Sequence, residues 1–349
     1  MGELPNYPAD YGAARTRFRE LATEKGWKLY TLPVDEASDL FIDIALWRGS
    51  SEKLVIHSSG VHGVEAFPGS AVQCTFLDTW VVSPNLPSIA LIHCVNPFGM
   101  RHLRRWNAQN IDLNRNFLAS FDNLPTHPLY DQLSPNLNPG TSKKLAIFKL
   151  RALKLIIKYG FSQLQQAIAQ GQYYDLRGLF FGGEQQAAET SLLCSFFQQY
   201  LGEYQIIRGI DFHTGLGKFG QSSFYLESTS EEQKYLAESL LGQLVILTQA
   251  NKALSYQTQG SLVAYLKQFY ASHDCLILTQ EIGTMGSVKI LQYLREENYY
   301  YQYQADKRRA YAIRLRDAFS PEDDQWKSKA IQAGIESLSR LIDHCCGLS

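Results

Sequence analysis

The chain has 349 residues, of which 45% are hydrophobic and 19% charged, and its formal net charge is −1. This composition is that of a globular protein with ample material for a core, and the charge balance provides no field that would attract nucleic acid or an anionic membrane. No apolar run approaches the ~20 residues of a membrane span, and the first residues lack the pattern of a secretory signal. Six scattered cysteines without paired spacing suit reduced thiols and a cytoplasmic location.

The first part of the chain predicts a helix and a series of strands. We expect a helix over 9–25, a hairpin of strands over 27–34 and 40–47, a strand over 53–58, a helix over 67–82 and a strand over 88–95. The last three elements form a βαβ unit, whose crossover should be right-handed. In such sheets ligands bind beyond the carboxyl ends of the strands.

The first candidate site follows the strand at 53–58. His62 and Glu65 stand just after small residues that end the strand, with two residues between them. Imidazole and carboxylate suit Zn²⁺, and a catalytic zinc commonly takes three protein ligands and leaves a fourth position for water. A His-x-x-Glu also occurs by chance. The interpretation therefore depends on a third ligand from elsewhere in the chain.

A long polar loop is predicted over 98–117, after the strand at 88–95. It contains several Arg and Asn side chains at the carboxyl edge of the sheet. A solvated connection is one interpretation of such a loop. Binding of an anion is the other, because Arg presents a planar fork to a carboxylate.

The rest of the chain predicts helices and a second set of strands. Helices are expected over 142–160, 163–170, 185–200, 231–251, 261–270 and about 321–345, and strands over 206–213, 222–227 and 274–281. The helix over 142–160 is basic and amphipathic. It could bind a membrane surface or a partner, but a helix that covers the core is preferred. We expect one domain over 1–349, an α/β fold with a mixed, mostly parallel sheet flanked by helices, and a helical insertion at about 137–200.

Two later strands end in side chains that suit a metal site. His213 ends the strand at 206–213, and Glu281 ends the strand at 274–281. A lone His at such a place is often structural, but two strand tips with ligand-type residues favour a shared site. A buried carboxylate without a partner is costly. Glu281 is therefore either an edge residue that faces water or a general base beside a metal.

Two other kinds of site are disfavoured. The glycines over 215–220 alternate as in a dinucleotide fingerprint, but a strand is predicted after them, so no helix N-terminus would hold the pyrophosphate. Ser58 and Ser59 lie beside His57, which raises the possibility of a serine hydrolase. The chain contains no Gly-x-Ser-x-Gly, however, and this argues against a nucleophile elbow.

Taken together, these pieces resemble the zinc carboxypeptidase superfamily. The resemblance rests on His62-x-x-Glu65, Val-Asn-Pro-Phe-Gly-Met over 95–100, Asn-Ile-Asp-Leu-Asn-Arg-Asn-Phe over 110–117, His213 and Glu281. It runs from about residue 40 to about residue 290, and Asp-Leu-Asn-Arg-Asn-Phe is its most specific part. More narrowly, the chain is similar to the bacterial carboxypeptidase-like and deacylase-like branch related to succinylglutamate desuccinylase and aspartoacylase.

The resemblance implies one zinc ion per chain, held by His62, Glu65 and His213. It implies that Asp112 orients the first His, because a carboxylate on the far imidazole nitrogen fixes the tautomer. Glu281 matches the general base of the family.

Other positions of the family concern the substrate. The resemblance implies that Asn114 and Arg115 bind a terminal carboxylate, and that Arg104 or Arg105 polarises the scissile carbonyl. The Tyr that covers the substrate has no secure counterpart. Tyr265 is preferred, and Tyr256 and Tyr270 remain open.

These expectations combine into a zinc-dependent hydrolase that cleaves an amide bond next to a free carboxylate. A metallocarboxypeptidase acting on small peptides is the first interpretation. A deacylase of N-acyl amino acids with the same fold is the second. A zinc-binding module without catalytic activity is the third.

Overall fold

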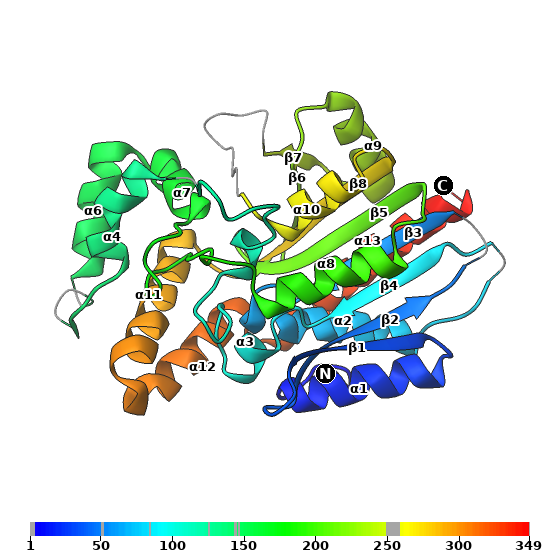
Figure 1. The fold of residues 1–349 in the computed structure, drawn as a ribbon, viewed down its shortest axis with the longest axis horizontal. Coiled ribbons are helices and arrows are strands. Elements are labelled where there is room, and N and C mark those ends of the chain that lie inside the picture. The colour runs from blue at the N-terminus through cyan, green and yellow to red at the C-terminus, as the bar shows by residue number, and fades with distance from the viewer. Residues whose placement is uncertain are drawn as a thin grey trace.

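The computed structural model describes residues 4–49, 52–83, 85–124, 126–142, 145, 147–248 and 259–348. Within these residues an eight-stranded sheet has the strand order β1-β2-β4-β3-β5-β8-β6-β7 (Figure 1). The strands are β1 Lys28–Asp35, β2 Leu40–Trp47, β3 Lys53–Ser59, β4 Ser88–His93, β5 Ile206–Gly215, β6 Ser222–Leu226, β7 Val245–Leu247 and β8 Asp274–Gly283.

The four central strands, β4, β3, β5 and β8, are parallel. Strands β1 and β2 form the expected antiparallel hairpin, which joins this core through β2 and β4. On the other side, β6 runs antiparallel to β8. The sheet is thus mixed and mostly parallel at its centre, as expected, and the carboxyl ends of the four central strands meet at one edge.

Helices cover both faces of the sheet because the central strands are apolar on both sides. One face packs against α1 Tyr11–Glu24, α2 Ala66–Asp78, α9 Glu231–Leu241 and α13 Asp324–Cys346. The other face packs against α8 Ala188–Tyr200 and α10 Leu262–Phe269.

A third group of helices extends beyond the sheet, at the left of Figure 1. It contains α4 Pro128–Leu137, α6 Phe148–Tyr159, α7 Phe161–Gln170, α11 Ser287–Tyr303 and α12 Arg308–Phe319. These helices contribute to an apolar cluster of their own, separate from the clusters on the two faces of the sheet. The short helix α3 Pro97–Arg101 packs instead with α1 and α2. Helix α8, which lies inside the predicted insertion at 137–200, instead packs on the sheet.

The structure differs from the sequence prediction in three other segments. The helix expected over 231–251 is wrong over 242–248, because α9 ends at Leu241, and the last three residues of that range lie outside the described residues. Gly242 then takes a left-handed conformation (φ +63°), and β7 follows. The segments over 118–141 and 284–319 had no predicted element; the first contains α4, and the second forms α11 and α12. In the described parts of the chain, no helix is both long and apolar enough to cross a bilayer.

Candidate metal centre and pocket

The loop after β3 is held in place by the polar loop over 98–117. The backbone N–H of Gly63 donates to the carbonyl of Arg105 at 3.2 Å, and that of Val64 donates to the carbonyl of Arg104 at 3.0 Å. A Cβ on Gly63 would lie 2.1 Å from the backbone of Gly99, so this close approach requires glycine. The two loops fix a short 3-10 turn, Gly63–Glu65, at the start of α2.

His62, Glu65 and His213 converge at the carboxyl edge of the sheet. Nδ1 of His62 lies 2.8 Å from Oε1 of Glu65, and Nδ1 of His213 lies 2.8 Å from Oε2 of the same carboxylate. One ligand atom from each residue falls within 4.8 Å of the others, and all three side chains are buried. Two imidazoles and a carboxylate form the donor set of a catalytic zinc site. The expected ligands therefore come together, and they fit a borderline divalent cation.

The far nitrogens of both imidazoles are bound by carboxylates. Nε2 of His62 lies 3.2 Å from Oδ1 of Asp112, as the resemblance implied. Nε2 of His213 lies 2.7 Å from Oδ2 of Asp211, and Oδ1 of Asp211 accepts from the Ser58 hydroxyl at 2.7 Å. This pairing favours a proton on each Nε2 and leaves each Nδ1 as the donor atom toward a cation.

The charged side chains of this group shift one another's pKa values. Burial raises the pKa of Glu65, but His62 and His213 outweigh it and hold that pKa well below its usual range. Burial lowers the pKa of His213, but Asp211 and Glu65 raise it well above its usual range. The carboxylates of Asp211 and Glu65 therefore favour positive charge at His213, and they would favour a divalent cation at this place for the same reason.

Glu281 lies beside this group on the neighbouring strand. In the parallel pair of β5 and β8, Glu281 is the register partner of His213. Its Oε1 accepts from the backbone N–H of Leu216 at 2.7 Å. Burial and the nearby Glu65 raise the pKa of Glu281 to about 8. The carboxyl of Glu281 is therefore close to the three candidate ligands. Among the described residues, however, Glu281 is not part of the group whose ligand atoms lie close enough together to hold a cation.

Arg105 connects the metal group to the wall of the pocket. Its Nε donates to Oδ2 of Asp112 at 3.0 Å, and its NH1 lies 3.7 Å from Oε1 of Glu65. Its guanidinium also lies over the ring of Phe180, 5.4 Å from the ring centroid. A cation in this place can stabilise negative charge that develops next to the metal group.

Asn114 and Arg115 line the same pocket. Oδ1 of Asn114 accepts from the backbone N–H of Leu262 at 3.1 Å, which fixes the side-chain amide. NH1 of Arg115 donates to the carbonyl of Asn114 at 2.9 Å, and Nε of Arg115 has no partner among the described residues. Arg115 is almost fully buried. A buried guanidinium with an unpaired N–H is suited to a carboxylate.

Arg104 lies away from the pocket, so the structure separates two neighbours that the sequence left equivalent. Its Nε donates to Oε1 of Glu297 at 3.0 Å, and its guanidinium stacks on the Tyr301 ring, 3.3 Å from the centroid. The side chain is completely buried against α11. Arg104 therefore anchors the polar loop to that helix, and of these two arginines it is Arg105 that lies at the site.

Tyr265 also lies away from the pocket. It packs on α10 between the rings of Phe117, Phe197 and Phe269, within the apolar cluster on one face of the sheet. Tyr270 is buried and donates to the carbonyl of Leu201. Tyr256 lies outside the described residues.

Two polar residues of the site escaped the sequence analysis. Asp211 is two positions before His213, and alternate residues of a strand share a face, so its place beside that His could have been inferred. Glu227 follows β6 and lines the pocket, where its Oε1 accepts from the Ser261 hydroxyl at 3.0 Å. Burial raises the pKa of Glu227. No local pattern marked Glu227, because its position depends on the pairing of β6 with β8.

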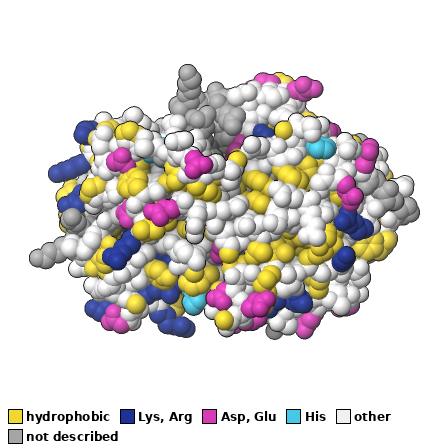
Figure 2. Space-filling view, in the orientation of Figure 1, with side chains coloured by type: hydrophobic (Ala, Val, Ile, Leu, Met, Phe, Trp, Pro, Cys, Tyr) yellow, Lys and Arg dark blue, Asp and Glu magenta, His cyan; other side chains and the backbone are white. Residues whose placement is uncertain are grey.

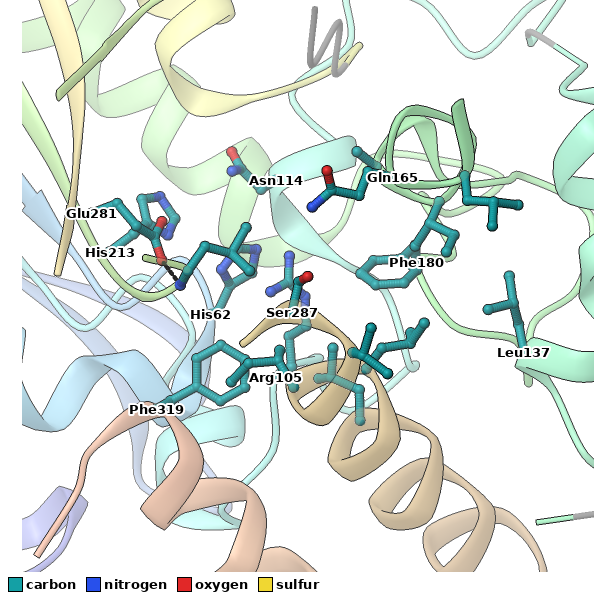
Figure 3. Close-up of a pocket in the computed structure, with 18 of the residues that line it drawn as sticks. His62, Arg105, Asn114, Leu137, Gln165, Phe180, His213, Glu281, Ser287 and Phe319 are labelled. Carbon is teal, nitrogen blue, oxygen red and sulfur yellow. Dashed lines mark hydrogen bonds between the residues drawn. The ribbon is translucent and has the colours of Figure 1, made fainter. Parts of the chain in front are cut away.

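The pocket has a cavity volume of about 290 Å³ and two chemically different ends. Figure 3 shows His62, His213 and Glu281 at one end, Leu137 at the other, and Arg105 and Phe180 between them. Beyond Phe180 the walls are mainly apolar side chains of α4, α6, α7 and α11. We call this part, lined by Leu137, Phe148, Leu155, Leu164, Phe180 and Leu291, the apolar arm.

Two solved structures with TM-scores above 0.5 support the fold. The thrombin-activatable fibrinolysis inhibitor has a TM-score of 0.56 at 9% identity, over 98% of this chain and 78% of that one. A candidate carboxypeptidase from Burkholderia mallei has a TM-score of 0.52 at 10% identity, over 95% and 67%. A candidate metallopeptidase from Shewanella denitrificans reaches a TM-score of 0.46 at 15% identity, over 97% and 91%. No curated protein matches the chain.

The sheet order and the His-Glu-His group at its carboxyl edge define a protein of the zinc carboxypeptidase-like α/β fold. A family model matches residues 7–333, which is most of the chain. The chain therefore belongs to the family described as protein of unknown function (DUF2817).

Proposed function

We propose that this protein is a zinc-dependent hydrolase that cleaves an amide bond next to a free carboxylate, in the manner of a metallocarboxypeptidase. The observation that carries the proposal is the buried group of His62, Glu65 and His213 with Glu281 beside it. A metal site alone could be structural. A carboxyl next to it, outside the three ligands, provides a base as well.

A zinc ion held by these three residues would polarise the scissile carbonyl and lower the pKa of a water molecule at the same place. Glu281 is positioned to accept the proton of that water and to pass it to the leaving amine. The hydrogen bond from Leu216 fixes one of its oxygens. Because a divalent cation favours ionised neighbours, it would lower the raised pKa of Glu281 and make the carboxylate available as a base.

The remaining polar residues would bind different parts of the substrate or orient the ligands. Arg105 lies next to Glu65, where it can stabilise negative charge on the carbonyl oxygen. Asn114 and Arg115 can bind the carboxylate of the substrate, which selects amides at the end of a chain. Asp112 and Asp211 keep both imidazoles in the orientation that the cation requires.

A second candidate has the same chemistry but a different substrate. An N-acyl amino acid also presents an amide beside a carboxylate, and the apolar arm favours it over a peptide. The arm lies on the side of Arg105 that faces away from the metal group.

The proposal is tested by metal content and by hydrolysis together. We expect about one zinc per chain in the wild type and its loss in His213→Ala. The matched control is His273→Ala, because His273 precedes the opposite end of β8 and should not affect the metal. The wild type should cleave amides beside a free carboxylate much faster than the same compounds with a carboxamide.

Two results would contradict this proposal. Unchanged zinc in His213→Ala would exclude the metal group. Zinc retention without hydrolysis of any peptide or acyl amino acid would instead indicate a binding module.

A further inference from the structure

We infer that the apolar arm binds an aliphatic acyl chain, so that the substrates are amino acids acylated with medium-length fatty acids. This inference rests on the proposed function, because it takes the scissile amide to lie at the metal group. It adds the identity of the group on the carbonyl side of that amide.

The distribution of charge in the pocket is the first reason. The charged side chains of its described lining are the metal group, Glu281, Arg105, Arg115 and Glu227. None of them lies on α4, α6, α7 or α11. Along these helices the described lining has three uncharged polar side chains, Asn136, Gln165 and Ser287, among many Leu, Ile and Phe.

Such a lining disfavours a peptide in the arm. An extended peptide carries a donor and an acceptor on nearly every residue. Each group that is buried without a partner costs about 1–3 kcal/mol, and the three polar side chains cannot satisfy several residues. An alkyl chain has no such groups, and its burial is favourable by about 0.8 kcal/mol per methylene.

The position of Arg105 indicates which part of the substrate enters the arm. Glu227 lies close enough to Arg115 for the two charges to interact, so both belong to the polar end that would hold the amino acid. Arg105 lies near Glu65 on one side and over the Phe180 ring on the other. A carbonyl group held beside Arg105 therefore continues past Phe180 into the arm (Figure 3).

The length of the lining gives the approximate length of the chain. Along α7 the pocket is lined from Phe161 to Ala169, and along α11 from Ser287 to Leu294. These stretches advance eight and seven residues, or about 10–12 Å of helix. An extended chain covers about 3.3–3.6 Å per three bonds, so about nine to eleven carbons span this length. This is longer than any apolar side chain of a coded amino acid.

The inference is tested with N-acetyl-, N-butanoyl- and N-octanoyl-L-alanine and with the peptide Leu-Leu-Ala. We expect kcat/KM to rise by up to about fourfold per methylene from butanoyl to octanoyl, and Leu-Leu-Ala to be a poorer substrate than N-octanoyl-L-alanine. Binding is measured separately by calorimetry with N-octanoyl- and N-acetyl-L-alanine on protein stripped of metal, where the octanoyl compound should bind more tightly.

A pair of variants on α6 tests where the acyl chain binds. Ala152 lines the pocket, and Ala152→Phe should lower the ratio of octanoyl to acetyl turnover at least ~10-fold, since a filled volume excludes several methylenes. The matched control is Leu153→Phe on the outer face, where Leu153 is 56% exposed and the ratio should stay unchanged. Figure 2 shows apolar and basic side chains side by side at this end of the molecule. Ala169→Phe on α7 is a second narrowing variant if Ala152→Phe does not fold.

The results separate this inference from the proposed function. Equal hydrolysis and equal binding of the acetyl and octanoyl compounds, or a preference for Leu-Leu-Ala, would contradict the inference that the arm binds an acyl chain. The proposed hydrolase function would not be affected by that result. Chain-dependent binding that Ala152→Phe weakens, without hydrolysis of any compound, would support the arm and refute the hydrolase.

Discussion

Replacement of Glu281 by Gln isolates the proposed proton transfer from the binding of the metal. The two side chains have nearly the same shape, and the amide oxygen of Gln can still accept the 2.7 Å hydrogen bond from Leu216. The three candidate ligands do not include Glu281. Glu281→Gln should therefore keep the fold and the zinc and lose only the base.

The magnitude follows from the contribution of a general base. Such a group usually accelerates a reaction by about 10²–10⁴-fold, so we expect kcat to fall at least ~100-fold, which corresponds to about 2.7 kcal/mol. KM should change little, because Asn114 and Arg115 bind the carboxylate. The assay is hydrolysis of the best substrate of the acyl-alanine series, with zinc measured by mass spectrometry on the same sample.

The control makes the same chemical change at another buried carboxyl. Glu189 lies outside the pocket, is 2% exposed and accepts from Nδ2 of Asn107 at 3.2 Å. Glu189→Gln should retain turnover. If Glu281→Gln hydrolyses at the wild-type rate, Glu281 is not the base. If it loses zinc, Glu281 is a ligand and the assignment of three ligands is wrong.

Three further predictions concern metal affinity, substrate binding and pH. Asp211→Asn should weaken zinc binding about 10–100-fold in a chelator competition, since it removes the carboxylate that orients His213; an unchanged affinity would count against that role. Arg115→Met should lower kcat/KM about 10–100-fold for substrates with a free carboxylate, the value of a charged hydrogen bond, but not for their carboxamides; an equal loss for both would indicate a structural effect. In metal-free protein Glu281 holds its proton up to a pKa of about 8, against 4.5 when unfolded. The folded state then binds more protons over that interval, so the wild type should lose stability relative to Glu281→Gln as pH rises through it, and parallel melting curves at all pH values would refute this.

The metal group could be predicted from the sequence because each of its parts is marked by a short pattern at the end of a strand. A strand that ends in small residues followed by His62-x-x-Glu65, and two later strands that end in His213 and Glu281, mark one edge of a parallel sheet. The parallel pairing of β3, β5 and β8 then brings these ends together. Periodicity also located most elements, since burial on one or both faces imposes it.

Two neighbouring arginines show what a local sequence pattern cannot predict. Arg104 and Arg105 carry the same charge, but one is buried against Glu297 and the other reaches the pocket. The choice depends on the path of the loop and on the position of α11, which had no predicted element. Tyr265 is a similar case, because the face of α10 on which it lies is set by packing against Phe197.

Local residue order was thus enough to specify every strand except β7, the helices of the sheet, the three candidate ligands and the residue that we propose as their base. Only tertiary packing decided whether Arg104 or Arg105 meets the pocket, that Glu227 lines it, and that an apolar arm continues from it. The physical reason is the range of the interactions. Strand tips in a parallel sheet gather at one edge whatever lies around them, whereas the arm exists only where helices from distant parts of the chain leave space between them.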